Sequence, residues 1–272
     1  MSWWPFRALQ SEGLHPLWAT AMIYFFAVVC VTVIRPTAWR SLAKPSLLWL
    51  LVLASGLTNV GFNWAVTVGD VVRVVLLFYL MPGWVVLLAW PLLGEKPTAG
   101  SLFRLALAFV GVVIVLKTPG SPWPVPESLA DGLALMGGFS FALTNVLLRK
   151  LNHTPEESRM LSMFGGGAVM ACIAALIGMN AGLVGALPAP AWPWVSVAIA
   201  LGLAFLAGNL ALQYGAAHLR ASTTSLIMLT EVVYASVSAM LLGAGELSLR
   251  TLVGGAFILL ASLLGVVSFK PS

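Results

Sequence analysis

Long apolar stretches follow one another along the chain, separated by short polar connections. About 20 predominantly apolar residues make a helix that crosses the ~30 Å hydrocarbon core of a bilayer. Each stretch is continuously apolar, whereas the strands of a membrane barrel alternate apolar and polar positions. The pattern therefore predicts nine transmembrane helices, over residues 14–34, 46–68, 71–93, 101–116, 130–151, 159–179, 192–213, 222–242 and 251–267.

Composition leaves little room for anything but these helices. Hydrophobic residues make up 60% of the 272 and charged residues 8%. The longest polar connections, residues 118–131 and 152–158, are too short to build a core of their own. We therefore expect an all-α integral membrane protein. Cys30 and Cys172 lie in apolar stretches and are expected to be reduced thiols rather than a disulfide.

Basic residues indicate how the chain crosses the membrane, because Lys and Arg favour the cytoplasmic side. With the segment before residue 14 outside, basic residues are concentrated on the cytoplasmic side, and the chain ends in the cytoplasm as a multi-pass protein of the inner (plasma) membrane. No cluster of basic and aromatic residues occurs, so nucleic acid is not an expected partner. The cytoplasmic set is Arg35, Arg40, Lys44, Lys96, Arg104, Arg149, Lys150, Arg159, Arg220 and Lys270, and the outer set is Arg7, Arg73, Lys117 and Arg250.

The two halves of the chain resemble each other. TNVGFNWAV around Asn59 is similar to AGNLALQYG around Asn209, and each is followed by a loop, a helix, a Gly-Glu pair and one more helix. An odd number of predicted helices separates the copies, so the second is inverted in the membrane. We expect two repeats, residues 1–120 and 128–270. Inverted repeats are typical of secondary transporters with a site near the bilayer midplane.

The predicted repeats are unequal, with four helices in the first and five in the second. Arg7 and Cys30 have the same spacing as Arg149 and Cys172, which aligns residues 1–11 with the end of the fifth predicted helix. They are interpreted as the remnant of a first helix that is largely missing. A start codon assigned too late is favoured over a real loss, and predicts a natively expressed protein heavier than 28.8 kDa.

Four segments resemble the EamA-type drug/metabolite transporter (DMT) superfamily: GLHPLWATA, DVVRVVLLFYLMPGWVVLLAWPLLGEKP, GLALMGGFSFALTNVLLRKL and STTSLIMLTEVVYASVSAMLLGAGE. The resemblance covers nearly the whole chain. It implies two inverted halves of five helices each and export of amino acids, nucleosides or other small metabolites. The chain departs from that pattern by lacking most of the first helix.

Glu231 is the one acidic residue near the middle of a predicted helix. A charged carboxylate at that depth costs roughly 2.5–3.5 kcal/mol on insertion scales, so we expect it to be protonated at rest. It is interpreted either as a proton-coupling group or as a structural hydrogen-bonding partner of Thr230, Tyr234 or a facing helix.

Other polar side chains recur at helical spacing. Asn59 and Asn63 share one helix face, as do Asn209 and Gln213, because they are four residues apart. These pairs either join helices or help to close one side of a path. Asn145 is the next candidate for a site wall.

Three aromatic residues, Tyr79, Trp84 and Tyr234, lie deep enough to contact an apolar or aromatic substrate. Arg73 is in a short outer turn, where a local ion pair with Asp70 or a contact with a substrate carboxylate would explain it. Further expectations are a helix kink at Pro82 and surface capping roles for Glu95 and Glu246.

The leading hypothesis is a secondary transporter that exports a small metabolite, most simply an amino acid or related compound, by alternating access. The alternative is a truncated, non-transporting membrane paralogue or an assembly partner. A lipid-modifying enzyme would need a cluster of nucleophile, base or metal ligands that the sequence lacks. Nucleotide-binding and zinc motifs are absent too, so the expected partners are a small-molecule substrate and the bilayer, with no cofactor or metal. A homodimer is left open.

Overall fold

The computed structural model describes residues 3–42, 47–117, 125–189, 192–218, 234, 237, 238, 241–243 and 248–267. Regular structure within these ranges is helical. The elements are α1 (Trp3–Ser11), α2 (Pro16–Ile34), the 3-10 helix η1 (Pro36–Ala38), α3 (Trp39–Leu42), α4 (Leu47–Val68), α5 (Val71–Phe78), α6 (Met81–Leu93), α7 (Ala99–Leu116), α8 (Leu129–Lys150), α9 (Glu156–Asn180), α10 (Trp192–His218) and α12 (Leu249–Val267).

The predicted helices within the described residues are present, with one change. The stretch 71–93 is divided into α5 and α6. Among the described residues, six segments are long and apolar enough to cross a membrane, and two further apolar helices, Trp194–Gly208 and Leu249–Leu264, are shorter. Most of the predicted helix 222–242 lies outside the described residues, so the prediction of nine transmembrane helices stays a prediction.

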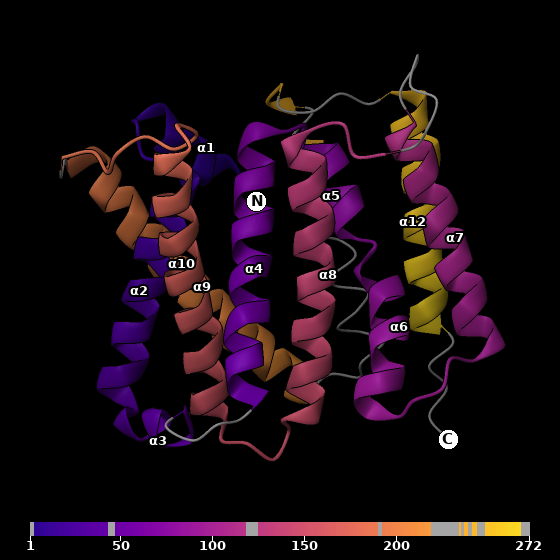
Figure 1. The fold of residues 1–272 in the computed structure, drawn as a ribbon, viewed down its shortest axis with the longest axis horizontal. Coiled ribbons are helices and arrows are strands. Elements are labelled where there is room, and N and C mark those ends of the chain that lie inside the picture. The colour runs from indigo at the N-terminus through magenta and orange to yellow at the C-terminus, as the bar shows by residue number, and fades with distance from the viewer. Residues whose placement is uncertain are drawn as a thin grey trace.

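The helices run roughly side by side, with α4 and α8 in the centre (Figure 1). On one flank α2 packs along α9, and α10 packs on α2. On the other flank α5 and α6 pack on α8, and α7 packs along α12. The central helices therefore connect two groups, each with its own apolar core.

Polar residues set the ends of several helices. Asp70, Thr98 and Ser128 precede α5, α7 and α8, and their side chains accept hydrogen bonds from backbone N–H groups in the first turn. These caps satisfy donors that a helix start leaves without an intrahelical partner. At the other end of α6, Gly94 takes the left-handed conformation, with φ of 75°, which glycine adopts without a steric penalty.

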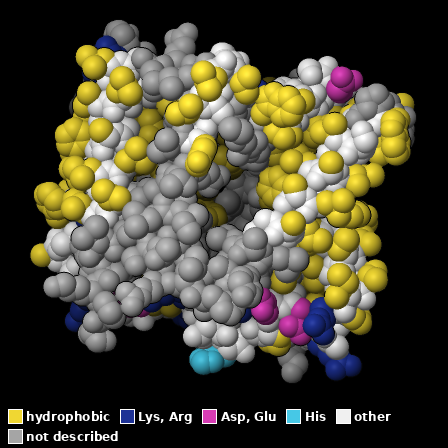
Figure 2. Space-filling view, turned by 180° about the vertical axis from the view of Figure 1, so that it is seen from behind, with side chains coloured by type: hydrophobic (Ala, Val, Ile, Leu, Met, Phe, Trp, Pro, Cys, Tyr) yellow, Lys and Arg dark blue, Asp and Glu magenta, His cyan; other side chains and the backbone are white. Residues whose placement is uncertain are grey.

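Large apolar side chains cover the outside of the molecule. Val33 is 75% exposed and Ile177 is 64% exposed. Figure 2 shows hydrophobic side chains over both flanks of one face and charged side chains toward its upper and lower ends. A water-soluble protein seldom exposes so much contiguous apolar surface, so this surface faces lipid.

Close contact between α4 and α9 depends on the absence of a side chain at Gly166. A Cβ atom there would lie 2.1 Å from the carbonyl oxygen of Val52 and 2.6 Å from the hydroxyl of Ser55. Small residues at such positions let membrane helices approach closely, where van der Waals packing holds them together. The neighbouring Gly165 has open space beside it.

His15 lies just before α2 and outside the membrane-spanning segments. Its Nδ1 accepts a hydrogen bond of 3.2 Å from the N–H of Leu17, and its ring packs edge-on against Trp64, with the ring centroids 5.5 Å apart. Burial lowers the pKa of His15 below its ordinary value. The neutral imidazole is thus the form that the fold favours.

We expect His15 to make stability depend on pH. Since the pKa is lower in the folded chain, the unfolded chain takes up the proton first as pH falls. The contribution of neutral His15 is complete above about pH 6.5, the ordinary pKa, and is lost progressively below it. His15→Asn retains an acceptor for the N–H of Leu17 without titrating, so thermal unfolding in detergent should fall less between pH 7.5 and pH 5 than in the wild type. Equal slopes would contradict this role.

Candidate functional site

The break between α5 and α6 creates a turn inside a membrane-spanning segment. Pro82 has no N–H and cannot donate to the carbonyl of Phe78 one turn earlier. On α8, a Cβ at Gly138 would lie 2.6 Å from that carbonyl oxygen. The absence of a side chain therefore lets the α8 backbone lie directly against the break, which confirms the disruption expected at Pro82.

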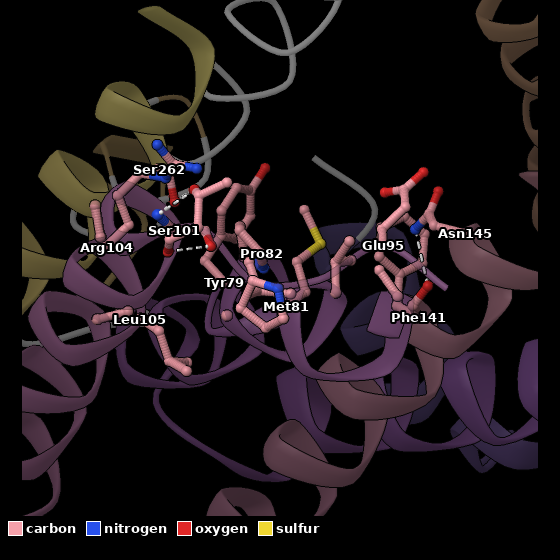
Figure 3. Close-up of a pocket in the computed structure, with 18 of the residues that line it drawn as sticks. Tyr79, Met81, Pro82, Glu95, Ser101, Arg104, Leu105, Phe141, Asn145 and Ser262 are labelled. Carbon is pink, nitrogen blue, oxygen red and sulfur yellow. Dashed lines mark hydrogen bonds between the residues drawn. The ribbon is translucent and has the colours of Figure 1, made fainter. Parts of the chain in front are cut away.

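A cavity of about 490 Å³ lies beside this break, between α6, α7, α8 and α12. The volume falls within the range of small-molecule binding sites. Figure 3 shows Met81 and Pro82 between a group containing Ser101, Arg104 and Ser262 and a group containing Glu95, Phe141 and Asn145. The described residues that line it are Tyr79, Met81, Pro82, Gly83, Val85, Val86, Ala89, Glu95, Lys96, Pro97, Thr98, Ser101, Arg104, Leu105, Ala108, Phe141, Asn145, Arg149, Ala261 and Ser262.

An exposed ion pair stands at one edge of the cavity. Arg149 Nη2 lies 2.6 Å from Glu95 Oε1, and the two side chains are 58% and 50% exposed. Next to it, Lys150 Nζ donates to the carbonyl of Leu92 over 2.7 Å. Together these contacts join the ends of α6 and α8. Glu95, expected only as a surface cap, thus also belongs to the cavity wall.

Two of the predicted site residues line this cavity. The Tyr79 side chain is buried, and Asn145 Nδ2 donates to the Phe141 carbonyl over 2.8 Å. Trp84 does not line the cavity. Its ring packs edge-on between Phe109 and Phe139, at centroid distances of 5.7 and 5.6 Å.

Asn59 and Asn63 join α4 to α2, away from the cavity. Asn63 Nδ2 donates to the hydroxyl of Thr20 over 3.1 Å, and the hydroxyl of Tyr24 donates to Asn59 Oδ1. Asn59 Nδ2 also donates to the Ser55 carbonyl over 2.8 Å. These contacts agree with the helix-joining interpretation of the pair.

Arg73 has a partner that the sequence did not indicate. Its guanidinium makes a two-point contact with Asp131 on α8, at 2.7 and 2.9 Å, and donates to the Val115 carbonyl at the end of α7 over 2.9 Å. Asp70 instead accepts from the backbone N–H of Arg73. The expected pairing of the Arg73 and Asp70 side chains is therefore replaced by a contact that ties α5, α7 and α8 together.

The remaining predicted site residues fall in or near the second repeat's undescribed part. Glu231 lies outside the described residues. Asn209 and Gln213 are on α10, but their side chains lie outside the described part as well. Tyr234 is described and is 65% exposed.

Sequence reasoning missed several residues of the cavity, among them Ser101, Arg104, Arg149 and Ser262. Serines are common in membrane helices and give no distinctive signal. Arg104 did give a signal in the sequence, since a basic residue within an apolar stretch is a functional candidate by default.

Apolar side chains on the outside, charges toward the ends and membrane-length helices define a multi-pass helical membrane protein. The sequence profile of the EamA-like transporter family matches residues 2–117 and 128–267. The chain belongs to this family, which makes it a membrane transporter.

Two individual proteins are similar over most of the chain. An uncharacterized transporter of Archaeoglobus fulgidus is 26% identical over 257 residues, which span 92% of this chain and 87% of the relative. A solved crystal structure matches with a TM-score of 0.59 at 17% identity, covering 100% of this chain and 96% of its own. At that identity the structural likeness shows the fold alone.

Proposed function

We propose that the protein is a secondary transporter of the inner (plasma) membrane that exports small metabolites, amino acids or related compounds, by alternating access. The observation that carries this proposal is the cavity of about 490 Å³ beside the broken α5–α6 segment. Broken helices expose backbone groups at mid-membrane, and transporters use them to line binding sites. The family supplies the transport function, and the cavity supplies a place for the solute.

Helix packing supports two inverted halves as the basis of the transport cycle. Equivalent helices of the two sequence repeats, α7 and α12, pack on each other and run in opposite directions. Gly111 meets Gly254, and the end of α7 at Lys117 accepts a hydrogen bond of 2.8 Å from Arg250 at the start of α12.

The second equivalent pair, α2 and α9, packs in the same way. Tyr24 lies against Gly167, and Ala38, just beyond α2, accepts a hydrogen bond of 2.9 Å from Ser158 in the first turn of α9. Equivalent helices that cross antiparallel are what a two-fold axis in the membrane plane requires. Both crossings therefore favour the inverted arrangement.

Charged side chains at the two ends of the helices indicate which state of the transport cycle the molecule adopts. Toward one end the cavity wall includes Glu95 and Lys96, which are exposed. Toward the other end, the Arg73–Asp131 contact holds α5 and α8 together. The distribution of Lys and Arg favours the orientation in which the end with Glu95 and Lys96 faces the cytoplasm. In that orientation the structure is a state open to the cytoplasm, and the C-terminus is cytoplasmic.

Efflux tests the proposal. The full chain in liposomes should release labelled amino acids or related metabolites from a panel, whereas a non-transporting paralogue should release none. Val86→Phe, which fills part of the cavity, should abolish most of the flux, because overpacking leaves no room for a solute. Leu87→Phe is the matched control, since Leu87 is exposed and does not line the cavity. Equal flux in the two variants would show that the solute does not use this cavity.

Coupling to protons through Glu231 is measured in the same vesicles. Glu231→Gln should lose accumulation of the solute driven by an imposed pH gradient yet retain exchange of labelled for unlabelled solute. An unchanged pH dependence would exclude Glu231 as the coupling group, and transport would then be facilitated diffusion or use another group.

A further inference from the structure

Arg104 is a cation inside a membrane-spanning helix, with no ion partner among the described residues. It lies in the second turn of α7, and its side chain lines the cavity. Burying a basic side chain in a membrane segment is costly, and such residues normally pair with a carboxylate or a carbonyl. Arg104 makes no hydrogen bond or ion pair with any residue in the described part of the chain.

Neighbouring basic residues show how such charges are otherwise accommodated. Arg73 binds Asp131, Arg149 binds Glu95, and Lys150 binds the Leu92 carbonyl. Arg159, in the first turn of α9, also lacks a side-chain partner for its Nε, but it does not line the cavity. Arg104 therefore combines a guanidinium that has no partner in the described part of the chain with access to the cavity.

We propose that Arg104 binds the anionic group, a carboxylate or a phosphate, of the solute that the protein transports. This inference rests on the proposed transport function and names the chemistry of its substrate. A planar guanidinium matches the two oxygens of a carboxylate or phosphate and forms charge-assisted hydrogen bonds to them.

The charge of the cavity favours an anion. Among the described lining residues, the cations are Lys96, Arg104 and Arg149, and the one carboxylate is Glu95. Arg149 already neutralises Glu95. An anionic solute would thus meet a net positive wall, which raises its local concentration.

Two of the hydroxyl donors near Arg104 are already used. The hydroxyl of Ser101 donates to the Thr98 carbonyl over 2.8 Å, and the hydroxyl of Ser262 donates to the Ile258 carbonyl over 3.1 Å. Among the described residues at this end of the cavity, the Arg104 guanidinium has N–H donors to spare. The hydroxyl oxygens can still accept, which suits a solute that carries a donor beside its anionic group.

Apolar side chains line the space beyond Arg104 and limit the solute further. Met81, Leu105, Ala108 and Phe141 contribute to the wall. A small inorganic anion would leave this surface without contacts. The substrate class is therefore a small organic anion or zwitterion with an apolar part.

Lipid headgroups carry the same phosphate chemistry, and long basic side chains can reach them from a helix end. The test must separate the two sources. We would measure thermal unfolding of the purified full chain in a non-ionic detergent with four probes that each carry an anionic group: the zwitterions leucine and phenylalanine, and the anions 4-phenylbutyrate and phenyl phosphate. Each is paired with an uncharged or carboxylate-free partner: leucinamide, phenylalaninamide, 4-phenylbutyramide and phenol. Phosphatidylglycerol is a separate arm.

At least one anionic probe should stabilise the wild type more than its partner does. Arg104→Gln should weaken binding of that probe at least about tenfold, the loss expected for a charge-assisted hydrogen bond, while Arg104→Lys should retain part of it. Arg40→Gln is the matched control, because it makes the same substitution at an exposed position away from the cavity wall. Unchanged unfolding of each variant without probe shows that it is folded.

Three results would overturn the inference: no preference for any anionic probe over its partner, a preference that survives in Arg104→Gln, or stabilisation by phosphatidylglycerol alone. Flux in liposomes separates this inference from the proposed function. If an uncharged solute is transported and its transport does not depend on Arg104, the proposed function is supported and the anion site is contradicted. Arg104-dependent binding of an anionic probe without flux would support the anion site and contradict the proposed transport function.

Discussion

Gly166→Leu should force α4 away from α9 and leave little folded protein. Because even a Cβ atom at this position would meet the Val52 carbonyl oxygen at 2.1 Å, the backbones themselves must separate. Overpacking a tight contact costs about 1–3 kcal/mol for small insertions, so Gly166→Ala should already lower the unfolding midpoint in detergent clearly. Leucine adds further volume at the same point and should prevent recovery of monodisperse protein.

Gly165→Ala is the control for this prediction. It makes the same chemical change one residue earlier on α9, where nothing lies within 4 Å of the added atom. We expect it to change stability by less than about 0.5 kcal/mol, as exposed substitutions usually do. Similar midpoints for the two alanine variants would show that α4 and α9 are less closely packed than the structure indicates.

Of the substitutions that remove a charge, Asp131→Ala should lower the stability of the protein most. The Asp131 side chain is 3% exposed and its partner Arg73 is 26% exposed, so the substitution leaves a cation largely shielded from water. Removing one partner of a buried ion pair costs roughly 3–5 kcal/mol, and the partial exposure of Arg73 places the expected loss near the lower value. Thermal or denaturant unfolding in detergent would measure it.

Two further variants separate a buried pair from an exposed one. Arg73→Leu combined with Asp131→Leu should recover much of the lost stability, because replacing a buried pair with apolar residues is often neutral. Glu95→Ala breaks the exposed pair with Arg149 and should cost no more than about 1 kcal/mol. An Asp131→Ala loss as small as that of Glu95→Ala would show that the Arg73 contact is solvated.

Hydrophobic length was sufficient to predict most of the helices in the part of the chain that the structure describes. The stretches 46–68 and 130–151, for instance, correspond to α4 (Leu47–Val68) and α8 (Leu129–Lys150), because lipid forces any long apolar segment to satisfy its backbone as a helix. Length alone did not predict that 71–93 would divide into two helices. Pro82 pointed to a disturbance there, but the position of the turn also depends on Gly138, whose contact with Phe78 is tertiary.

The candidate site was less predictable, since it depends on which side chains meet. Arg73 lies close in sequence to Asp70, yet it pairs with Asp131 on another helix. Trp84 lies near the middle of the predicted stretch 71–93, but it packs between Phe109 and Phe139 and does not line the cavity. Tyr79 and Asn145 line the cavity. Depth along a helix can be counted from sequence, whereas the direction in which a residue faces depends on the rotation of each helix against its neighbours.

The division between α5 and α6 also bears on how the chain is made. Val71–Leu93 contains 23 residues and is apolar enough to enter the bilayer as a single membrane-spanning segment. Because Pro82 lacks an N–H, the Phe78 carbonyl at the end of α5 has no backbone donor one turn later, and the α8 backbone at Gly138 packs against that carbonyl. Gly138 is synthesised after the whole of Val71–Leu93. The first half of the protein therefore cannot complete its packing until the ribosome has begun to synthesise the second half.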